Sequence, residues 1–274
     1  MPANEMHALA ELLRGGDVVV LTGAGVSTDS GIPAYRDEEG RWKQNAPMQF
    51  RDFVGSVLSR QRYWARSMVG WDRMAKAQPN DAHRALGEME RRGMLRLLIT
   101  QNVDGLHSAA GSENVVDLHG RLDRVVCLDC RRLSPRDELQ ARLVAENPAF
   151  LGQSFVARAD GDVELAVDYE RFRLTACAEC GGVLKPDVVF FGENVPAPRV
   201  ERAMVSLSGA RALLIVGSSL MVFSGFRFAR AAARQAVPIA VVNLGKTRAD
   251  DMAALRLAGN VGELLTTALR AASS

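Results

Sequence analysis

The sequence predicts an α/β fold in which a doubly wound, parallel, Rossmann-like sheet carries a smaller inserted zinc-binding and helical module. The first observation behind this prediction is a series of short apolar runs that alternate with helical segments, a pattern typical of strands buried in a parallel sheet. The second is a pair of Cys-x2-Cys motifs that interrupts the alternation. The chain has 274 residues, which is enough for one large domain and one small domain.

The amino-terminal part of the chain is predicted to form a helix, a strand and a loop. Residues 6–13 have apolar side chains at helical spacing, and Gly15 and Gly16 then stop the helix. Residues 18–21 form an apolar run that is too short for a helix, so it predicts a buried strand. Further strands are predicted at residues 95–100, 212–217 and 238–245, and further helices at 80–93, 225–235 and 262–272.

Two regions depart from this alternation and define the predicted domains. Residues 37–78 are rich in arginine and aromatic side chains, with helical patterning after Phe50, and residues 121–182 are bracketed by the cysteine pairs. We therefore assign residues 1–37, 80–120 and 183–274 to a Rossmann-like domain, 38–79 to a loop and the helical part of a small domain, and 121–182 to a module bracketed by the cysteine pairs.

The composition excludes several classes of protein. Apolar residues make up 47% of the chain and charged residues 24%, which excludes disordered and fibrous proteins. The net charge of +2 is too small to indicate a nucleic-acid partner. No apolar run approaches the roughly 20 residues of a membrane span, and the first residues do not resemble a secretory or mitochondrial leader. We expect a cytoplasmic protein without nucleic-acid or membrane partners; the oligomeric state stays open, with a monomer favoured.

A glycine-containing loop follows the first predicted strand. Gly23 and Gly25 would let the backbone approach a pyrophosphate, but a tight structural turn explains them as well. Thr28 replaces the third glycine of a dehydrogenase fingerprint, and no acidic residue follows at the spacing that would bind a ribose. Further along, Tyr35 offers a stacking ring and Arg36 a phosphate-pairing guanidinium.

Polar residues follow the second long apolar run. Gln101, Asn102 and Asp104 suit a carboxamide and ribose hydroxyls, or alternatively form a polar turn. His119 lies between Leu118 and Gly120 and is a candidate proton-transfer group, although a buried structural histidine is the commoner case. The same structural interpretation applies to the other histidines, His7, His83 and His107.

The four cysteines predict one structural zinc site. Cys127 and Cys130 form one Cys-x2-Cys pair and Cys177 and Cys180 form another, with 46 residues between the pairs. Thiolates in this spacing suit tetrahedral zinc, and four protein ligands leave no position for a reacting water. A redox dithiol pair and a nucleic-acid-binding zinc ribbon are the alternatives, and the near-neutral charge disfavours the second.

Several motifs occur in one fixed order along the chain: GAGVSTDSGIPAYR, TQNVDGLH, LHG, the paired cysteines, KPDVVFFGE, VGSSL and NLG. Together they resemble the sirtuins, a family of NAD-dependent protein deacylases, over residues 17–265. The segments QRYWAR, VGW, SGFRFA and NLGKTRADD are most similar to the class II branch, which includes the lipoamidase-type mitochondrial sirtuin and bacterial relatives.

The resemblance implies that the Rossmann-like domain (1–37, 80–120 and 183–274) binds NAD, that 38–79 includes the cofactor loop, and that 121–182 is the zinc-binding module. It also implies a role for each matching residue. His119 matches the catalytic base, and Asn102 and Asp104 match the nicotinamide and ribose pocket. The implied NAD-binding residues are Gly23, Ala24, Gly25, Thr28, Asp29, Pro33, Tyr35, Arg36, Gln101, Asn102, Val103, Asp104, Gly217, Ser218, Ser219, Asn243, Leu244, Gly245 and Val261. The implied residues of a strand that pairs with an extended acyl-lysine peptide are Val188, Phe190, Phe191, Gly192 and Glu193.

The resemblance also implies the chemistry. The carbonyl oxygen of an acylated lysine attacks C1′ of the nicotinamide ribose, nicotinamide leaves, and His119 is the base for a later attack by a ribose hydroxyl. Water completes the reaction and gives free lysine, nicotinamide and 2′-O-acyl-ADP-ribose, so NAD is consumed as a co-substrate. The alternative enzymatic function is protein mono-ADP-ribosyltransfer in the same site, whereas the missing third glycine disfavours a dehydrogenase. The non-enzymatic alternative is a zinc-ribbon binding module.

The spacing of Tyr63 and Arg66 suggests which acyl groups the protein removes. At this spacing both residues share one face of a helix, where a hydroxyl and a guanidinium can hold a carboxylate. Class III sirtuins, which remove succinyl and glutaryl groups, have a Tyr and an Arg spaced in this way. We therefore expect both residues to line an acyl channel that favours acidic or polar-tailed chains. A solvated basic helix face is the alternative, because other arginines lie close by.

Overall fold

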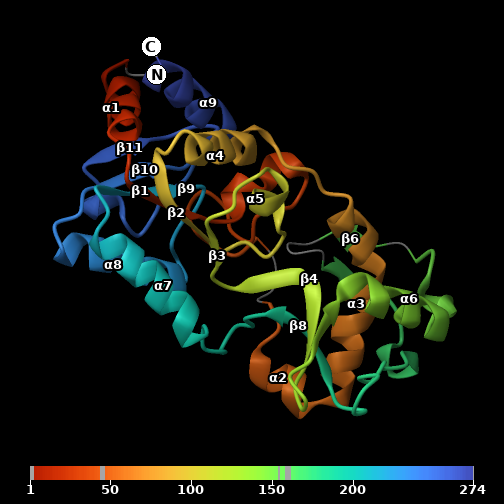
Figure 1. Cartoon of the computed structure of the whole chain (residues 1–274). Helices are drawn as coiled ribbons and strands as arrows, with labels where there is room; N and C mark the ends of the chain where they lie inside the picture. Colours follow the sequence, from red (N-terminus) through yellow and green to blue (C-terminus); the bar gives the residue numbers. More distant parts are fainter. Residues whose placement is uncertain (1–2, 44–46, 154, 158–161, 274) are drawn as a thin grey trace.

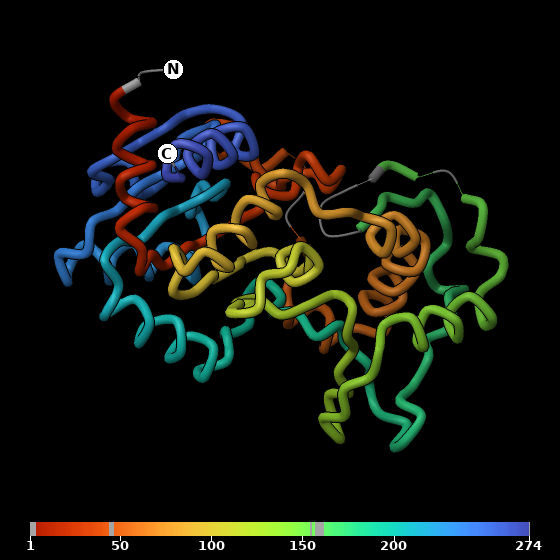
Figure 2. Tube along the Cα trace, turned by 45° about the horizontal axis from the view of Figure 1, so that its top comes forward, coloured from red at the N-terminus to blue at the C-terminus, as the bar shows by residue number. Residues whose placement is uncertain are grey.

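The computed structural model describes residues 3–43, 47–153, 155–157 and 162–273. Residues 44–46 belong to the expected cofactor-loop region, and residues 154 and 158–161 belong to the expected zinc-binding module; both groups lie outside the described residues. Figure 1 shows a larger part, which holds the parallel sheet and both chain ends, and a smaller part beside it. Figure 2 shows the same two parts from a view turned by 45°.

A six-stranded parallel sheet forms the centre of the larger part. In spatial order its strands are β11 (Leu255–Leu257), β10 (Ile239–Val242), β9 (Ala212–Val216), β1 (Val18–Thr22), β2 (Leu95–Thr100) and β3 (Val115–Asp117). Four of these strands confirm the predicted apolar runs, although β10 ends three residues before the predicted end at Gly245. The doubly wound, parallel, Rossmann-like sheet is therefore confirmed.

Helices cover both faces of this sheet (Figure 1). One face carries α1 (Ala3–Arg14), α4 (Asp81–Arg91) and α9 (Val261–Ala272), and the other carries α7 (Ala197–Ser208) and α8 (Phe223–Arg234). The central strand β1 serves both faces, because successive side chains of a strand point to opposite sides. Val18 and Val20 join the core under α1 and α9, whereas Val19 and Leu21 join the core under α7 and α8.

The smaller part combines an antiparallel sheet with helices. Its three-stranded sheet has the order β5 (Leu133–Pro135), β4 (Gly120–Cys127) and β8 (Leu184–Val188). The helices are α2 (Phe50–Gly55), α3 (Val57–Ala75) and α6 (Arg136–Glu146), and a short antiparallel pair joins β6 (Val156–Ala157) to β7 (Val163–Glu164). The predicted helical patterning after Phe50 is confirmed by α2 and α3.

One predicted domain boundary differs from the strand pairing. Residues 183–274 were expected to belong to the Rossmann-like domain, yet β8 pairs with β4 in the small antiparallel sheet. The chain therefore returns to the parallel sheet after β8. Strand pairing between β4 and β8 depends on a contact between residues some 60 positions apart, for example Val126 and Lys185, and no local pattern encodes it.

Short helices and turns connect the main elements near the sheet. The structure describes η1 (Ala24–Val26), η2 (Thr28–Ser30), α5 (Leu106–Ala109), η3 (Pro148–Phe150), η5 (Tyr169–Arg171) and η6 (Asp250–Met252). Among the described helices, none combines the length and apolar character that crossing a membrane requires.

The histidines outside the predicted site differ in burial. His83 and His107 are buried with their rings 4.8 Å apart, and His107 Nε2 lies 2.9 Å from the hydroxyl of Thr22, so their structural interpretation is confirmed. Burial lowers the pKa of His83 to about 4 and lowers the pKa of His107 as well. The same interpretation is wrong for His7, whose side chain is 75% exposed on α1 beside Glu11.

Candidate active site

The carboxyl ends of the parallel strands border a cavity of about 560 Å³. Loops after β1, β2, β9 and β10 form one side of the cavity, and β8 with α3 from the smaller part form the other. The predicted NAD-binding residues that line it are Gly23, Ala24, Gly25, Thr28, Asp29, Pro33, Tyr35, Arg36, Gln101, Asn102, Val103, Gly217, Ser218, Ser219, Asn243, Leu244, Gly245 and Val261. The structure thus brings together motifs that lie far apart in the sequence.

The glycines after β1 fit against the turn after β9. The N–H of Gly25 donates to the carbonyl oxygen of Gly217 at 2.8 Å, and the N–H of Gly23 donates to Val216. A Cβ on Gly25 would lie 2.8 Å from the Gly217 oxygen, and a Cβ on Gly217 would lie 2.6 Å from the backbone nitrogen of Val26. Because backbone atoms cannot rotate aside, these glycines are required by the contact between the two turns as well as by the open cavity.

The expected cofactor loop folds over the cavity edge. The Arg36 guanidinium lies 3.8 Å from the centre of the Trp42 ring and donates to the carbonyl oxygen of Gly40. The carbonyl oxygen of Glu38 accepts a 2.8 Å hydrogen bond from the N–H of Lys246, which follows β10. Trp42 and Lys246 also line the cavity, and the sequence analysis did not single them out. An aromatic and a basic residue next to a predicted phosphate-binding stretch are the signals that could have identified them.

The polar cluster after β2 is held by its own hydrogen bonds. The Asn102 amide donates to the carbonyl oxygen of Gly23 at 3.1 Å and to the hydroxyl of Ser27 at 2.9 Å. Ser27 in turn donates to Asp104 at 2.6 Å, and the other Asp104 oxygen accepts from the N–H of Leu106. Asp104 is not among the described residues that line the cavity. It binds Ser27 and the first residue of α5 instead of facing the cavity, and its expected contact with the ligand stays a prediction.

His119 lines the cavity as a neutral imidazole with a fixed orientation. Its Nδ1 lies 2.9 Å from the carbonyl oxygen of Gln101. A carbonyl only accepts, so Nδ1 carries the proton and Nε2 carries the lone pair. Burial lowers the pKa of His119 from 6.5 to about 4; the hydrogen bond to Gln101 opposes this shift, and the positive charges of Arg199 and Arg227 add to it. A neutral histidine at pH 7 is able to accept a proton.

Ser224 is a site residue that the sequence analysis missed. Its hydroxyl lies 2.8 Å from Nε2 of His119 and donates to that nitrogen's lone pair. Ser224 is the second residue of α8, and Gly225 after it leaves room for the Gln101 side chain. The segment SGFRFA was singled out only for its resemblance, because the contact between α8 and the residue before β4 is not visible in the sequence.

The predicted substrate strand continues from β8. The N–H of Val189 donates to the carbonyl oxygen of His119 at 2.8 Å, which ties the substrate segment to the candidate base. Val188, Phe190 and Phe191 line the cavity. Gly192 and Glu193 lie outside the described lining; Glu193 instead accepts from the N–H of Phe190 and pairs with the buried ammonium of Lys185 at 3.1 Å.

Tyr63 and Arg66 both line the cavity from α3. The Tyr63 ring lies 5.2 Å from the Phe190 ring. Arg66 is buried, so the alternative of a solvated helix face is wrong for this residue. The expected open carboxylate clamp is also not what the structure describes, because the Arg66 guanidinium already pairs with the carboxylate of Asp162 at 2.6 Å.

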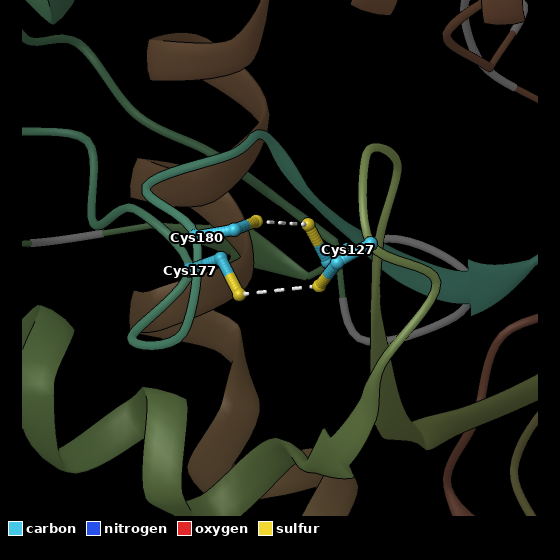
Figure 3. Close-up of side chains that lie close together, drawn as sticks. Cys127, Cys177 and Cys180 are labelled. Atoms are coloured by element: carbon cyan, nitrogen blue, oxygen red, sulfur yellow. Dashed lines mark hydrogen bonds between the residues drawn. The ribbon is translucent and has the colours of Figure 1, made fainter.

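The four cysteines gather at one end of the small sheet. Figure 3 shows the thiols of Cys127, Cys177 and Cys180 pointing toward one another from two facing turns. The sulfur of Cys127 lies 3.6 Å from that of Cys180, the sulfur of Cys130 lies 3.8 Å from that of Cys177, and all four lie within 4.8 Å. Tetrahedral zinc with bonds of about 2.3 Å requires sulfurs about 3.8 Å apart. The cluster therefore fits one structural zinc ion.

A match between this sequence and a protein-family model identifies the family of the chain. The model described as the Sir2 family matches residues 23–224, which include the glycine loop, the polar cluster, His119 and all four cysteines. The chain belongs to the Sir2 family. The predicted resemblance to the sirtuins is confirmed, and the class II subtype stays a prediction.

Curated and solved Sir2-family relatives match along nearly the whole chain. An NAD-dependent protein deacetylase of Xanthomonas axonopodis pv. citri (strain 306) is 53% identical over 267 residues, covering 97% of this chain and 91% of the relative. An NAD-dependent protein deacetylase of Bordetella bronchiseptica (strain ATCC BAA-588 / NCTC 13252 / RB50) is 52% identical, covering 96% of each. The solved complex "Sir2-p53 peptide-NAD+" superposes with a TM-score of 0.77 at 28% identity, covering 97% of each chain.

We expect Cys180→Ser to remove zinc from this Sir2-family chain and to lower its unfolding temperature. A closed four-thiolate site contributes its binding free energy to folding, and three thiolates bind the ion less tightly. Metal analysis and thermal unfolding of the purified protein measure both effects. Glu179→Gln is the control, because it changes an exposed neighbouring residue that pairs with Arg132 and should retain zinc. Wild-type protein that contains no zinc after purification without chelators would contradict the assignment.

Proposed function

We propose that this chain is an NAD-dependent protein lysine deacylase that produces deacylated lysine, nicotinamide and 2′-O-acyl-ADP-ribose. The observation that carries the proposal is a neutral, oriented His119 in the same cavity as the glycine turns and the predicted substrate strand. The curated relatives named deacetylases support deacylation over ADP-ribosyltransfer to protein. The exact acyl group, the class II subtype and a cytoplasmic location stay predictions.

The residues after β1 and β2 would bind and orient NAD, whose nicotinamide ribose supplies the electrophilic carbon when bound. Asn102 uses both hydrogens of its amide on Gly23 and Ser27, which leaves its oxygen to accept from a carboxamide. The Gln101 amide donates to Ser218 at 2.6 Å and so connects the turns after β2 and β9. Apolar side chains such as Val103 and Phe190 line the same cavity and exclude water from the reacting centre.

His119 would take up the proton of a ribose hydroxyl at Nε2. The Gln101 carbonyl keeps Nδ1 protonated, so in the neutral ring the lone pair is on Nε2, the nitrogen that faces Ser224. Once Nε2 holds a proton it becomes a donor, and the Ser224 hydroxyl can rotate to accept from it. Ser224 can therefore form a hydrogen bond with His119 whether the imidazole is neutral or protonated.

The acyl-lysine substrate would enter as an extended peptide beside the residues that follow β8. β8 is an edge strand of its three-stranded sheet among the described residues, and an edge strand can pair with an added peptide strand. Main-chain hydrogen bonds of that kind bind many sequences, which agrees with a protein substrate rather than a single small molecule. The complex of a Sir2 relative with a p53 peptide supports the same class of partner.

His119→Ala is expected to lower kcat for deacylation at least about a hundredfold, because it removes the general base. His7→Ala is the matched control, since His7 is exposed on α1. Mass spectrometry of products from NAD and acetyl-lysine peptide measures all species at once. The proposal requires equal amounts of nicotinamide, deacylated peptide and acyl-ADP-ribose. Nicotinamide with an ADP-ribosylated protein and an unchanged peptide would instead favour the transferase.

The pH profile of kcat/KM should follow the lowered pKa of His119. A base must be unprotonated, and burial lowers the pKa of His119 to about 4. As pH falls, kcat/KM should stay level through 6.5 and decrease only toward 4. The measurement needs a parallel circular dichroism check, because buried His83 and His107 also resist protonation and destabilise the fold in acid. A half-maximal value near pH 6.5 with intact fold would contradict the account.

A further inference from the structure

The guanidinium of Arg66 is bound by a segment of the chain itself. Its Nε donates to the carbonyl oxygen of Val163, and a terminal nitrogen donates to Asp162 Oδ2 at 2.6 Å. The other Asp162 oxygen accepts from the N–H of Val163 at 2.9 Å, which orients the carboxylate. The start of β7 therefore presents a backbone oxygen and a carboxylate to α3, and the two elements are in contact.

Burial of Arg66 makes this ion pair costlier to break than an ordinary surface pair. The Arg66 side chain is only 10% exposed, whereas the Asp162 side chain is 40% exposed and lines the same cavity as Tyr63. Paired surface charges contribute little, but a buried guanidinium that loses its carboxylate is left with an uncompensated charge. Arg66 is thus held to Asp162 on the side of the cavity where Tyr63 and Phe190 lie together.

We propose that Asp162 is a specificity-determining residue that occupies, with its own carboxylate, the place at Arg66 that an acidic acyl chain would need. The cavity therefore selects lysines with neutral acyl chains over succinyl- or glutaryl-lysine. This inference rests on the proposed deacylase function and names the substrate class of the same site. It replaces the sequence-based expectation of a preference for acidic chains, because Arg66 and Asp162 together carry no net charge.

A second carboxylate at this place meets repulsion rather than attraction. A glutaryl tail that shares Arg66 with Asp162 brings two negative charges to one guanidinium in a partly buried site. A tail that displaces Asp162 breaks the buried pair instead. Arg62 is the other cation of α3 that lines the cavity, but it is exposed, so water and salt screen its attraction.

Asp162→Asn tests the charge without changing the shape. The amide oxygen still accepts from Val163 or from Arg66, so the start of β7 stays in place while the negative charge is removed. Asp162→Ala is the second variant, and it also removes the remaining neutral acceptor. Asp72→Asn is the matched control, because it makes the same change on α3 at an exposed carboxylate that pairs with Lys76.

The experiment compares glutaryl-lysine and pentanoyl-lysine peptides, which have chains of equal length and differ in the terminal carboxylate. The measured quantity is the ratio of their kcat/KM values, with acetyl-lysine peptide as the reference substrate. We expect wild type and Asp72→Asn to prefer pentanoyl, and both Asp162 variants to raise the glutaryl-to-pentanoyl ratio about tenfold or more. Adding Arg66→Met to Asp162→Asn should abolish the gain, because the guanidinium supplies it.

Peptide binding without NAD, followed by fluorescence polarisation, gives a readout that does not need turnover. The same ratio of dissociation constants should show the same change in preference. If acetyl-lysine peptide is not deacylated at all, the proposed function fails, and the binding ratio still decides the role of Asp162. A wild-type preference for glutaryl, or an unchanged ratio in both Asp162 variants, overturns the inference.

Discussion

Two backbone turns, one after β1 and one after β9, interlock so closely that no side chain fits between them. Gly25 donates its N–H to the Gly217 carbonyl, and a Cβ on either residue would meet backbone atoms of the other turn. This contact fixes the distance between neighbouring strands at the edge where the cavity opens. Gln101 extends the same contact to β2, because its amide donates to Ser218 in the second turn and to the carbonyl oxygen of Thr22 at the end of β1.

The candidate base is tied to this arrangement through its backbone partners. The Gln101 carbonyl sets the protonated nitrogen of His119, and the His119 carbonyl accepts from Val189 in the predicted substrate segment. One residue therefore connects the predicted NAD side of the cavity with the predicted peptide side. The smaller part of the molecule contributes the proposed acyl side through α3 and through Asp162, which precedes β7. The cysteine cluster at the end of its sheet brings together the end of β4 and the turn before β8. Four protein ligands would close the coordination shell of a zinc ion there, which is consistent with a structural ion that takes no part in the reaction.

Local patterns predicted the parts of the structure that depend on local physics. Apolar runs identified the central strands, glycine-containing turns identified the cavity edge, and cysteine spacing identified the metal cluster. Long-range pairing was not predictable in this way, which is why the pairing of β8 with β4 was not anticipated and Ser224 was missed beside His119. Asp104 was expected to contact the ligand, yet its carboxylate is used by Ser27 and Leu106. Arg66 was located correctly, but its partner Asp162 lies 96 residues further along the chain.

NAD binding to a Gly25→Ala variant tests most directly whether the two interlocked turns form the NAD site. Isothermal titration calorimetry would be run on wild type, on Gly25→Ala and on Gly55→Ala, a control glycine at which an added Cβ would have nothing within 4 Å. The account predicts that Gly25→Ala lowers NAD affinity at least about tenfold while zinc content and helical signal are retained, because the added methyl group separates the two turns. Gly55→Ala should bind as wild type does. Equal NAD affinity in Gly25→Ala and wild type would contradict the account.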